Sequence, residues 1–149
     1  MEYKTLKSPM KKIIVVNALL LLFLSCDSGG TFNNKNPNIP NYSFNLEIDM
    51  SLPGYSNLQF ASNHIINYSV GARGIVVFNT GNNFVAFDLA CPNIPFANCE
   101  SPMDIDGIEA ICDCDDTTYN LFSGQSAGQE YAMKQYRTSV EGNIVIVYN

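Results

Sequence analysis

The chain has 149 residues, of which 46% are hydrophobic, and carries 8 lysines and arginines against 14 aspartates and glutamates. Beyond residue 25 it keeps 4 of the basic and 13 of the acidic residues, so the net charge of that part is −9. Because so acidic a surface repels phosphate groups, the composition argues against nucleic acid and anionic lipid headgroups as partners.

Residues 1–25 have the pattern of a secretory signal peptide. Lysines dominate the start, and an almost unbroken apolar run follows at residues 13–24. A helix of that length reaches about 18 Å, well short of the roughly 30 Å hydrocarbon core of a bilayer, so a transmembrane span is not expected. Met10, which two lysines follow, opens an equally good signal, so translation starts at Met1 or Met10.

The next residue, Cys26, is expected to carry a lipid. The stretch FLSC at residues 23–26 resembles the lipobox of bacterial lipoproteins, in which the cysteine is acylated and becomes the mature N-terminus. Two or more acyl chains hold a protein stably on a bilayer. The resemblance therefore implies a membrane-anchored protein of the bacterial cell envelope that faces the periplasm or the exterior. The alternative is ordinary signal cleavage with Cys26 unmodified.

The remaining chain divides into a tether and one domain. Residues 26–41 consist mostly of Gly, Asn and Pro with little apolar surface to bury, which predicts a flexible tether that begins with the lipidated cysteine. Residues 42–149 have the length of a single folded domain.

That domain is predicted to be all-β. Apolar and polar residues alternate in short runs between turn signals, and no run keeps a helical period. The turn signals include Asp106-Gly107, which is the strongest two-residue hairpin pattern, and Glu141-Gly142-Asn143. Eight or nine short strands with such frequent turns are typical of an antiparallel β-sandwich or barrel. The clearest runs lie at residues 44–50, 65–68, 74–79, 84–87, 103–105, 108–111, 139–140 and 144–148.

Four cysteines lie within the domain, at Cys91, Cys99, Cys112 and Cys114. Export would place them in an oxidising compartment, where cysteines tend to form disulfides. Four cysteines allow three pairings, and their spacing alone does not choose among them.

The residues around these cysteines follow a known pattern. The first segment reads Cys91-Pro92-Asn93 after a strand, and the second reads Cys112-Asp113-Cys114-Asp115. An aromatic residue, Tyr119, and a glycine, Gly124, follow, the glycine 12 residues after Cys112. This order resembles the two cluster-binding loops of the Rieske iron–sulfur family, and residues 133–136 and the terminal strands resemble its closing segment. The resemblance covers residues 44–149 and implies a Rieske-like antiparallel fold with a small loop subdomain.

The chain departs from the family at the ligands. A Rieske cluster uses two cysteines on one iron and two histidines on the other. Cys91 and Cys112 match the cysteine ligands, whereas Asn93 and Asp115 stand where the family has histidine. The single histidine of the chain, His64, lies in an early predicted strand. The resemblance therefore implies a degenerate member without the ligands of the second iron.

The resemblance also implies a disulfide pairing. In the respiratory and photosynthetic Rieske proteins, a middle cysteine of the second loop forms a disulfide with the first loop. Cys114 matches that cysteine and Cys99 would be its partner, while Cys91 and Cys112 would pair once the iron between them is gone. Each bond would stabilise the domain by about 2–4 kcal/mol. This predicts a cluster-free, non-catalytic binding or structural module whose partner, a protein or a small molecule, is unknown.

Two other interpretations of the loops remain open. The first is an electron carrier with a [2Fe-2S] cluster held by Cys91, Asn93, Cys112 and Asp115, or by all four cysteines. The second is a calcium-type cation site, since hard oxygen ligands suit that ion, although the spacing matches no known calcium loop. Its candidate ligands are Glu100, Asp104, Asp106, Glu109, Asp113, Asp115 and Asp116.

Catalysis is not expected. The sequence shows no nucleophile–histidine arrangement, no phosphate-binding loop and no paired catalytic carboxylates, and it offers a single histidine as a possible base. No cofactor other than the alternative [2Fe-2S] cluster is implied.

Overall fold

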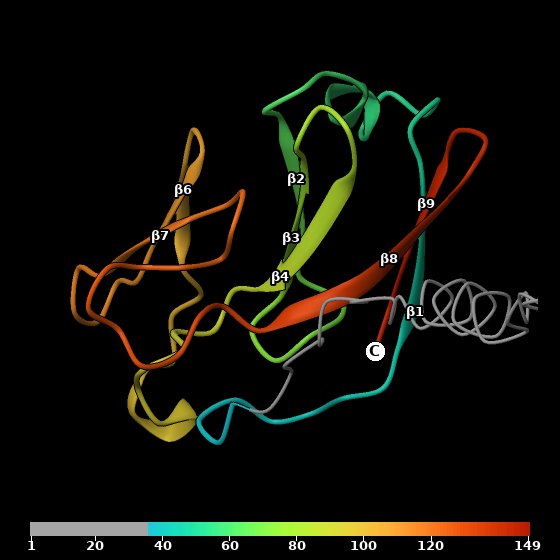
Figure 1. Ribbon diagram of the computed structural model, residues 1–149. Helices are drawn as coiled ribbons and strands as arrows, with labels where there is room; N and C mark the ends of the chain where they lie inside the picture. The colour runs from blue at the N-terminus through green and yellow to red at the C-terminus, as the bar shows by residue number, and fades with distance from the viewer. Residues whose placement is uncertain (1–35) are drawn as a thin grey trace, which may run out of the picture. The chain divides into compact units, whose positions relative to one another are not determined.

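The computed structural model describes residues 36–149, and these form an antiparallel all-β domain with nine strands (Figure 1). The predicted fold class is therefore confirmed. The signal segment, Cys26 and the first part of the predicted tether lie outside the described residues. Within residues 36–149, no helix has the length and hydropathy needed to cross a membrane.

Six strands form the larger sheet, in the order β1-β9-β8-β4-β3-β2. Only two residue pairs, Ala86–Tyr136 and Phe87–Gln135, join β4 to β8, so the sheet consists of two three-stranded halves with a short seam. The strands are β1 (Asn45–Asp49), β2 (His64–Asn67), β3 (Ile75–Asn79), β4 (Phe84–Asp88), β8 (Gln135–Glu141) and β9 (Ile144–Tyr148).

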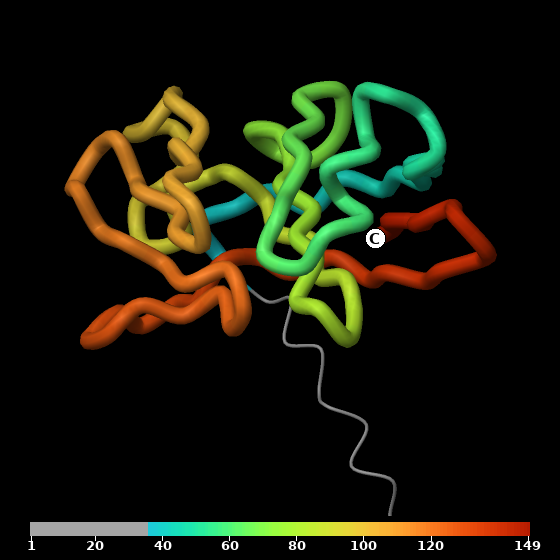
Figure 2. Tube along the Cα trace, turned by 90° about the horizontal axis from the view of Figure 1, so that it is seen from above, coloured from blue at the N-terminus to red at the C-terminus, as the bar shows by residue number. Residues whose placement is uncertain are grey.

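A second sheet of three short strands forms the small loop subdomain and lies beside the larger sheet in both views (Figures 1 and 2). It contains β5 (Asp104–Asp106), β6 (Glu109–Ile111) and β7 (Thr118–Asn120). Two short 3-10 helices, η2 (Ser56–Gln59) and η3 (Phe96–Asn98), lie in the connections.

The hairpin between β5 and β6 differs from the prediction by one residue. Asp106 pairs with Glu109, so the two loop residues are Gly107 and Ile108 rather than Asp106 and Gly107. Gly107 has a φ of +59°, a left-handed conformation that glycine adopts without steric cost. The glycine therefore opens the loop, and Asp106 extends the strand.

The core lies on both faces of β3, which is buried along its whole length. Because side chains alternate along a strand, Ile75 and Val77 pack with the larger sheet, while Val76 and Phe78 face the loop subdomain. The second of these clusters also contains Cys91, Cys99 and Cys112. Three of the four loop cysteines are thus part of the hydrophobic core that joins the two sheets.

A buried carboxylate at the end of β4 fixes the start of the first cysteine loop. Asp88 has no exposed surface, and its oxygens accept hydrogen bonds from the backbone N–H groups of Ala72 (2.6 Å), Ala90 (2.8 Å) and Arg73 (3.3 Å) and from the Tyr136 hydroxyl (2.7 Å). Burial raises the pKa of Tyr136, and the charge of Asp88 and its hydrogen bond raise it further, so the hydroxyl keeps its proton and remains a donor.

Residues 36–41 pack against the domain, although they belong to the predicted tether. The side-chain amides of Asn36 and Asn38 each donate to the carbonyl oxygen of Pro92, at 2.9 Å in both cases. The ammonium group of Lys134, which is 2% exposed, donates to the carbonyl oxygen of Pro40 at 2.6 Å. Part of the segment assigned to the tether therefore covers the first cysteine loop.

We expect Asp88→Asn to destabilise the domain by roughly 2–4 kcal/mol, because an amide nitrogen would face N–H and O–H donors inside the core. Tyr136→Phe is the matched variant. It removes one of the hydrogen bonds and should cost roughly 1–2 kcal/mol. Urea unfolding of the three proteins measures both values. Equal midpoints for Asp88→Asn and the wild type would contradict this role of the carboxylate.

Candidate functional site

Two disulfides join the loop after β4 to the loop after β6. Cys91 bonds to Cys112 with a Cα–Cα distance of 5.6 Å, and Cys99 bonds to Cys114 with a Cα–Cα distance of 6.1 Å. Of the three possible pairings, this is the one that the sequence resemblance implied. The loops that follow β4 and β6 thus lie side by side, and two disulfide bonds join them.

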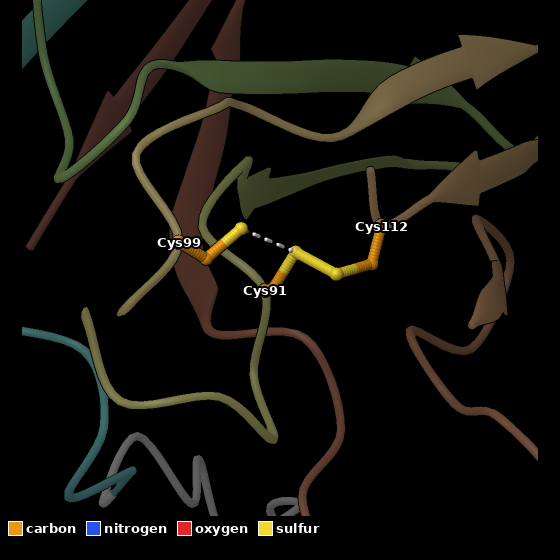
Figure 3. Close-up of side chains that lie close together, drawn as sticks. All are labelled: Cys91, Cys99 and Cys112. Carbon is orange, nitrogen blue, oxygen red and sulfur yellow. Dashed lines mark hydrogen bonds between the residues drawn. A yellow bond between two sulfur atoms is a disulfide. The ribbon is translucent and has the colours of Figure 1, made fainter. Parts of the chain in front are cut away.

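The buried half of the outer disulfide, Cys99, lies against the bonded pair of Cys91 and Cys112 in the core (Figure 3). The Sγ atom of Cys99 lies 3.5 Å from the Sγ atom of Cys91, and these two atoms lie within 4.8 Å of the Sγ atom of Cys112. Both members of the 3.5 Å contact are oxidised and carry no hydrogen, so it is a van der Waals contact. Cys91, Cys99 and Cys112 are 4%, 5% and 1% exposed, whereas Cys114 is exposed to solvent.

The side chain of Arg73 binds the backbone of the first loop. Its guanidinium group donates to the carbonyl oxygens of Phe96 at 3.1 Å and Cys99 at 3.2 Å. The same group stacks on the Phe96 ring, with 3.9 Å between the Cζ atom and the ring centroid. These contacts fix the backbone at Phe96 and at Cys99 itself, so the position of Cys99 does not depend on the disulfide alone.

The second loop is a tight turn. The backbone N–H of Cys112 donates to the carbonyl oxygen of Thr117, and the N–H of Asp116 donates back to the carbonyl oxygen of Cys112, both at 2.9 Å. Asp115 accepts a hydrogen bond from the N–H of Thr117 at 3.0 Å and is exposed. The turn therefore places Cys114 and the aspartates at the surface, and the carboxylate of Asp115 is used to close the turn.

Asn93 occupies the first histidine place and connects three segments. Its amide nitrogen donates to the hydroxyl of Tyr119 at 2.8 Å and to the carbonyl oxygen of Tyr131 at 2.7 Å. Its amide oxygen accepts from the N–H of Tyr131 at 2.9 Å. Both amide hydrogens and the amide oxygen therefore form hydrogen bonds within the protein. Through them Asn93 connects the first loop to the segment before β8.

Tyr119 lies next to both histidine places. Its side chain is 1% exposed, and burial raises the pKa of its hydroxyl. The hydrogen bond from Asn93 lowers this pKa, and the charge of Asp115 raises it. The phenol of Tyr119 therefore keeps its proton inside the core, where it accepts the hydrogen bond from Asn93.

This arrangement does not fit a [2Fe-2S] cluster. Cys91 and Cys112 are bonded to each other and have no thiolate to offer an iron. Asn93 is saturated by Tyr119 and Tyr131, and Asp115 is turned to its own loop. The four-cysteine alternative meets the same obstacle, because Cys99 and Cys114 are bonded as well.

The acidic side chains proposed for a cation site are all exposed, and they do not converge. Among residues 36–149, the three buried cysteines form the one group of potential ligands whose donor atoms lie close together. The exposed acidic residues are Glu100, Asp104, Asp106, Glu109, Asp113, Asp115 and Asp116.

His64 begins β2, an edge strand of the larger sheet, where it pairs with Phe78. Burial lowers the pKa of its imidazole.

Gly124 is required because the chain packs closely against the Phe87 ring of β4. Its φ of +69° is left-handed, and a Cβ atom at this position would lie 2.6 Å from the Cε1 atom of Phe87. The backbone of Gly124 bonds to Asn120 and Met133, each at 2.7 Å, which turns the chain back toward β8. The glycine that carries the sequence resemblance therefore lets the chain pass close to a core aromatic ring.

Sequence reasoning missed Asp88 and Tyr131. Asp88 is a single acidic residue at a strand end, and its partners lie as far away as Tyr136, 48 residues on. Tyr131 meets Asn93 through its backbone, so its residue type carried no signal. The amide at Asn93 was the available clue, because an amide can donate and accept at once.

We expect Asn93→Ala to destabilise the domain by roughly 2 kcal/mol, because three hydrogen bonds are lost and the backbone of Tyr131 loses its partners. Asn98→Ala, an exposed position of the same loop, is the control and should change stability by less than about 0.5 kcal/mol. Thermal unfolding at constant pH compares them. Equal melting temperatures for the two variants would show that the hydrogen bonds of Asn93 do not stabilise the domain.

Comparison with known proteins does not identify a family. No family model matches the chain, and no curated protein matches it. A chain from a complex of reduced oxygenase and oxidised ferredoxin in carbazole 1,9a-dioxygenase is similar with 20% identity over 70% of this chain and 92% of that chain, at a TM-score of 0.47. A putative nitrite reductase NADPH small-subunit protein is similar with 16% identity over 68% of this chain and 97% of that chain, at a TM-score of 0.41.

Proposed function

We propose that this chain is an exported, membrane-anchored lipoprotein of the bacterial cell envelope with a Rieske-like domain that has lost its iron–sulfur cluster. The domain serves as a disulfide-stapled binding or structural module without catalytic activity. One observation carries this proposal: the two cysteines that match cluster ligands, Cys91 and Cys112, are bonded to each other.

The positions that match the second iron support the same conclusion. Imidazole supplies a nitrogen donor to that iron in Rieske sites. Here Asn93 offers an amide whose hydrogen-bonding groups are all engaged, and Asp115 is an exposed carboxylate. In such a site the Cys91–Cys112 disulfide, rather than a metal, joins the two loops.

The charge of the domain narrows the kind of partner. Two cations of the described residues, Arg73 and Lys134, are directed at backbone carbonyl oxygens within the protein. Carboxylates are exposed around the second loop at Asp113, Asp115 and Asp116. The surface beside the disulfides is therefore negative and suits a cationic or neutral protein or small molecule, and it opposes nucleic acid.

Iron and visible absorbance measured on one preparation test the loss of the cluster. The full chain is produced in a bacterium that exports it, with iron in excess, and is purified without oxygen. We expect a colourless protein with less than about one iron per ten chains and no free thiol in the folded domain. A red-brown protein with two irons per chain would replace this proposal with the [2Fe-2S] electron carrier.

Lipid labelling tests the anchor. We expect the wild-type chain to incorporate radioactive palmitate and to remain in the membrane fraction after a carbonate wash, since acyl chains hold it there. Cys26→Ser should lose the label and move to the soluble fraction or keep its signal segment. Cys114→Ser is the matched control and should keep the label. Labelling that is unchanged in Cys26→Ser would refute lipidation at this residue.

A further inference from the structure

We propose that the four cysteines form a disulfide-exchange site for an external dithiol, which enters at Cys114 and opens both cross-links with a single two-electron reduction. The proposal rests on the positions of the four sulfur atoms and does not require the lipid anchor or the loss of a cluster.

The entry point follows from exposure. Thiol–disulfide exchange requires a thiolate to reach one sulfur of the disulfide. Cys114 is exposed, whereas Cys99 and both members of the inner disulfide are at most 5% exposed. An external thiolate therefore attacks the Sγ atom of Cys114. The bond to Cys99 breaks, a mixed disulfide forms between the reagent and Cys114, and Cys99 leaves as a thiolate.

The second step follows from the contact between the two disulfides. The Sγ atom of Cys99 lies 3.5 Å from the Sγ atom of Cys91 (Figure 3), so the thiolate forms against a sulfur that it can attack. A bond forms between Cys99 and Cys91, the bond from Cys91 to Cys112 breaks, and the electron pair leaves on the Cys112 sulfur, which takes a proton. Because Cys99 and Cys91 are held together in one core, the Cys99 thiolate has a high effective concentration at the Cys91 sulfur.

The second thiol of the external dithiol completes the two-electron reduction. This thiol attacks the mixed disulfide and releases Cys114 as a thiol, and the dithiol leaves as an oxidised cyclic disulfide. Two electrons have then moved from the dithiol to the protein. The protein holds one disulfide, between Cys91 and Cys99, and two thiols, at Cys112 and Cys114.

The exchange changes which parts of the fold are joined. Cys91 and Cys99 both belong to the first loop, and Cys112 and Cys114 both belong to the second. In the oxidised protein both disulfides run between the loops. After the exchange the remaining disulfide lies within the first loop, so one reduction removes both covalent ties and frees the second loop with two thiols beside its aspartates.

The variant Cys114→Ser tests the exchange without a reductant, because it leaves Cys99 as a free thiol beside an intact inner disulfide. The protein is quenched in acid, its thiols are alkylated, and its disulfides are mapped by peptide mass spectrometry. We expect two isomers, one with the Cys91–Cys112 bond and one with the Cys91–Cys99 bond. Finding the first isomer alone would overturn the proposal.

Cys99→Ser is the matched control. It also leaves one free thiol, at Cys114, which lies outside the group of sulfurs that are within 4.8 Å of one another. We expect the Cys91–Cys112 bond to remain intact in every molecule of this variant. Exchange that was equally extensive in both variants would show that the contact between Cys99 and Cys91 is not the route, and would overturn the proposal.

The wild-type chain is tested with one equivalent of dithiothreitol, followed by the same mapping. The proposal predicts that reduced molecules carry the Cys91–Cys99 bond with thiols at Cys112 and Cys114. Simple reduction of the outer disulfide would instead leave the Cys91–Cys112 bond with thiols at Cys99 and Cys114. Recovery of that second product alone would contradict the proposed attack of Cys99 on Cys91, even if both disulfides can be reduced.

Discussion

The bond between Cys91 and Cys112 is the constraint on which the site depends. It joins the ends of β4 and β6, which belong to different sheets, and it lies in the core cluster that also holds Phe87 and Tyr119. With the two sulfurs bonded to each other, the loop tips need no metal to meet. The outer disulfide, the turn of the second loop and the amide of Asn93 are then all arranged around a covalent link.

Much of the fold could be predicted from alternation along the chain, because β3, β4 and β9 have long enough apolar patterns to mark their buried faces. β7 was not predicted, since its three residues show no period and, unlike β5 and β6, it is not marked by an adjacent Asp-Gly turn. The turn after β5 was placed one residue early, because the pattern Asp-Gly marks a turn without fixing the register. The packing of residues 36–41 depends on the carbonyl oxygen of Pro92, which accepts two hydrogen bonds that no local pattern reveals.

The site was predictable to the extent that it resembles a known pattern. The resemblance supplied the pairing of Cys91 with Cys112 and of Cys99 with Cys114, which spacing alone left open. It did not reveal what replaces the histidines. Asn93 works through the backbone of Tyr131, 38 residues away, and a contact of that kind depends on the fold rather than on the partner's residue type. The contact between the two disulfides likewise exists only in three dimensions.

The central claim is that sulfur–sulfur bonds hold the two loops together. Disulfide mapping of the natively exported chain, alkylated in the intact cell and digested in acid, tests it most directly. The account predicts two cross-linked peptides, one that joins Cys91 to Cys112 and one that joins Cys99 to Cys114, with no alkylated cysteine in the domain. Alkylation of Cys91 and Cys112 in most molecules would contradict it, since these thiols would then be available to a metal.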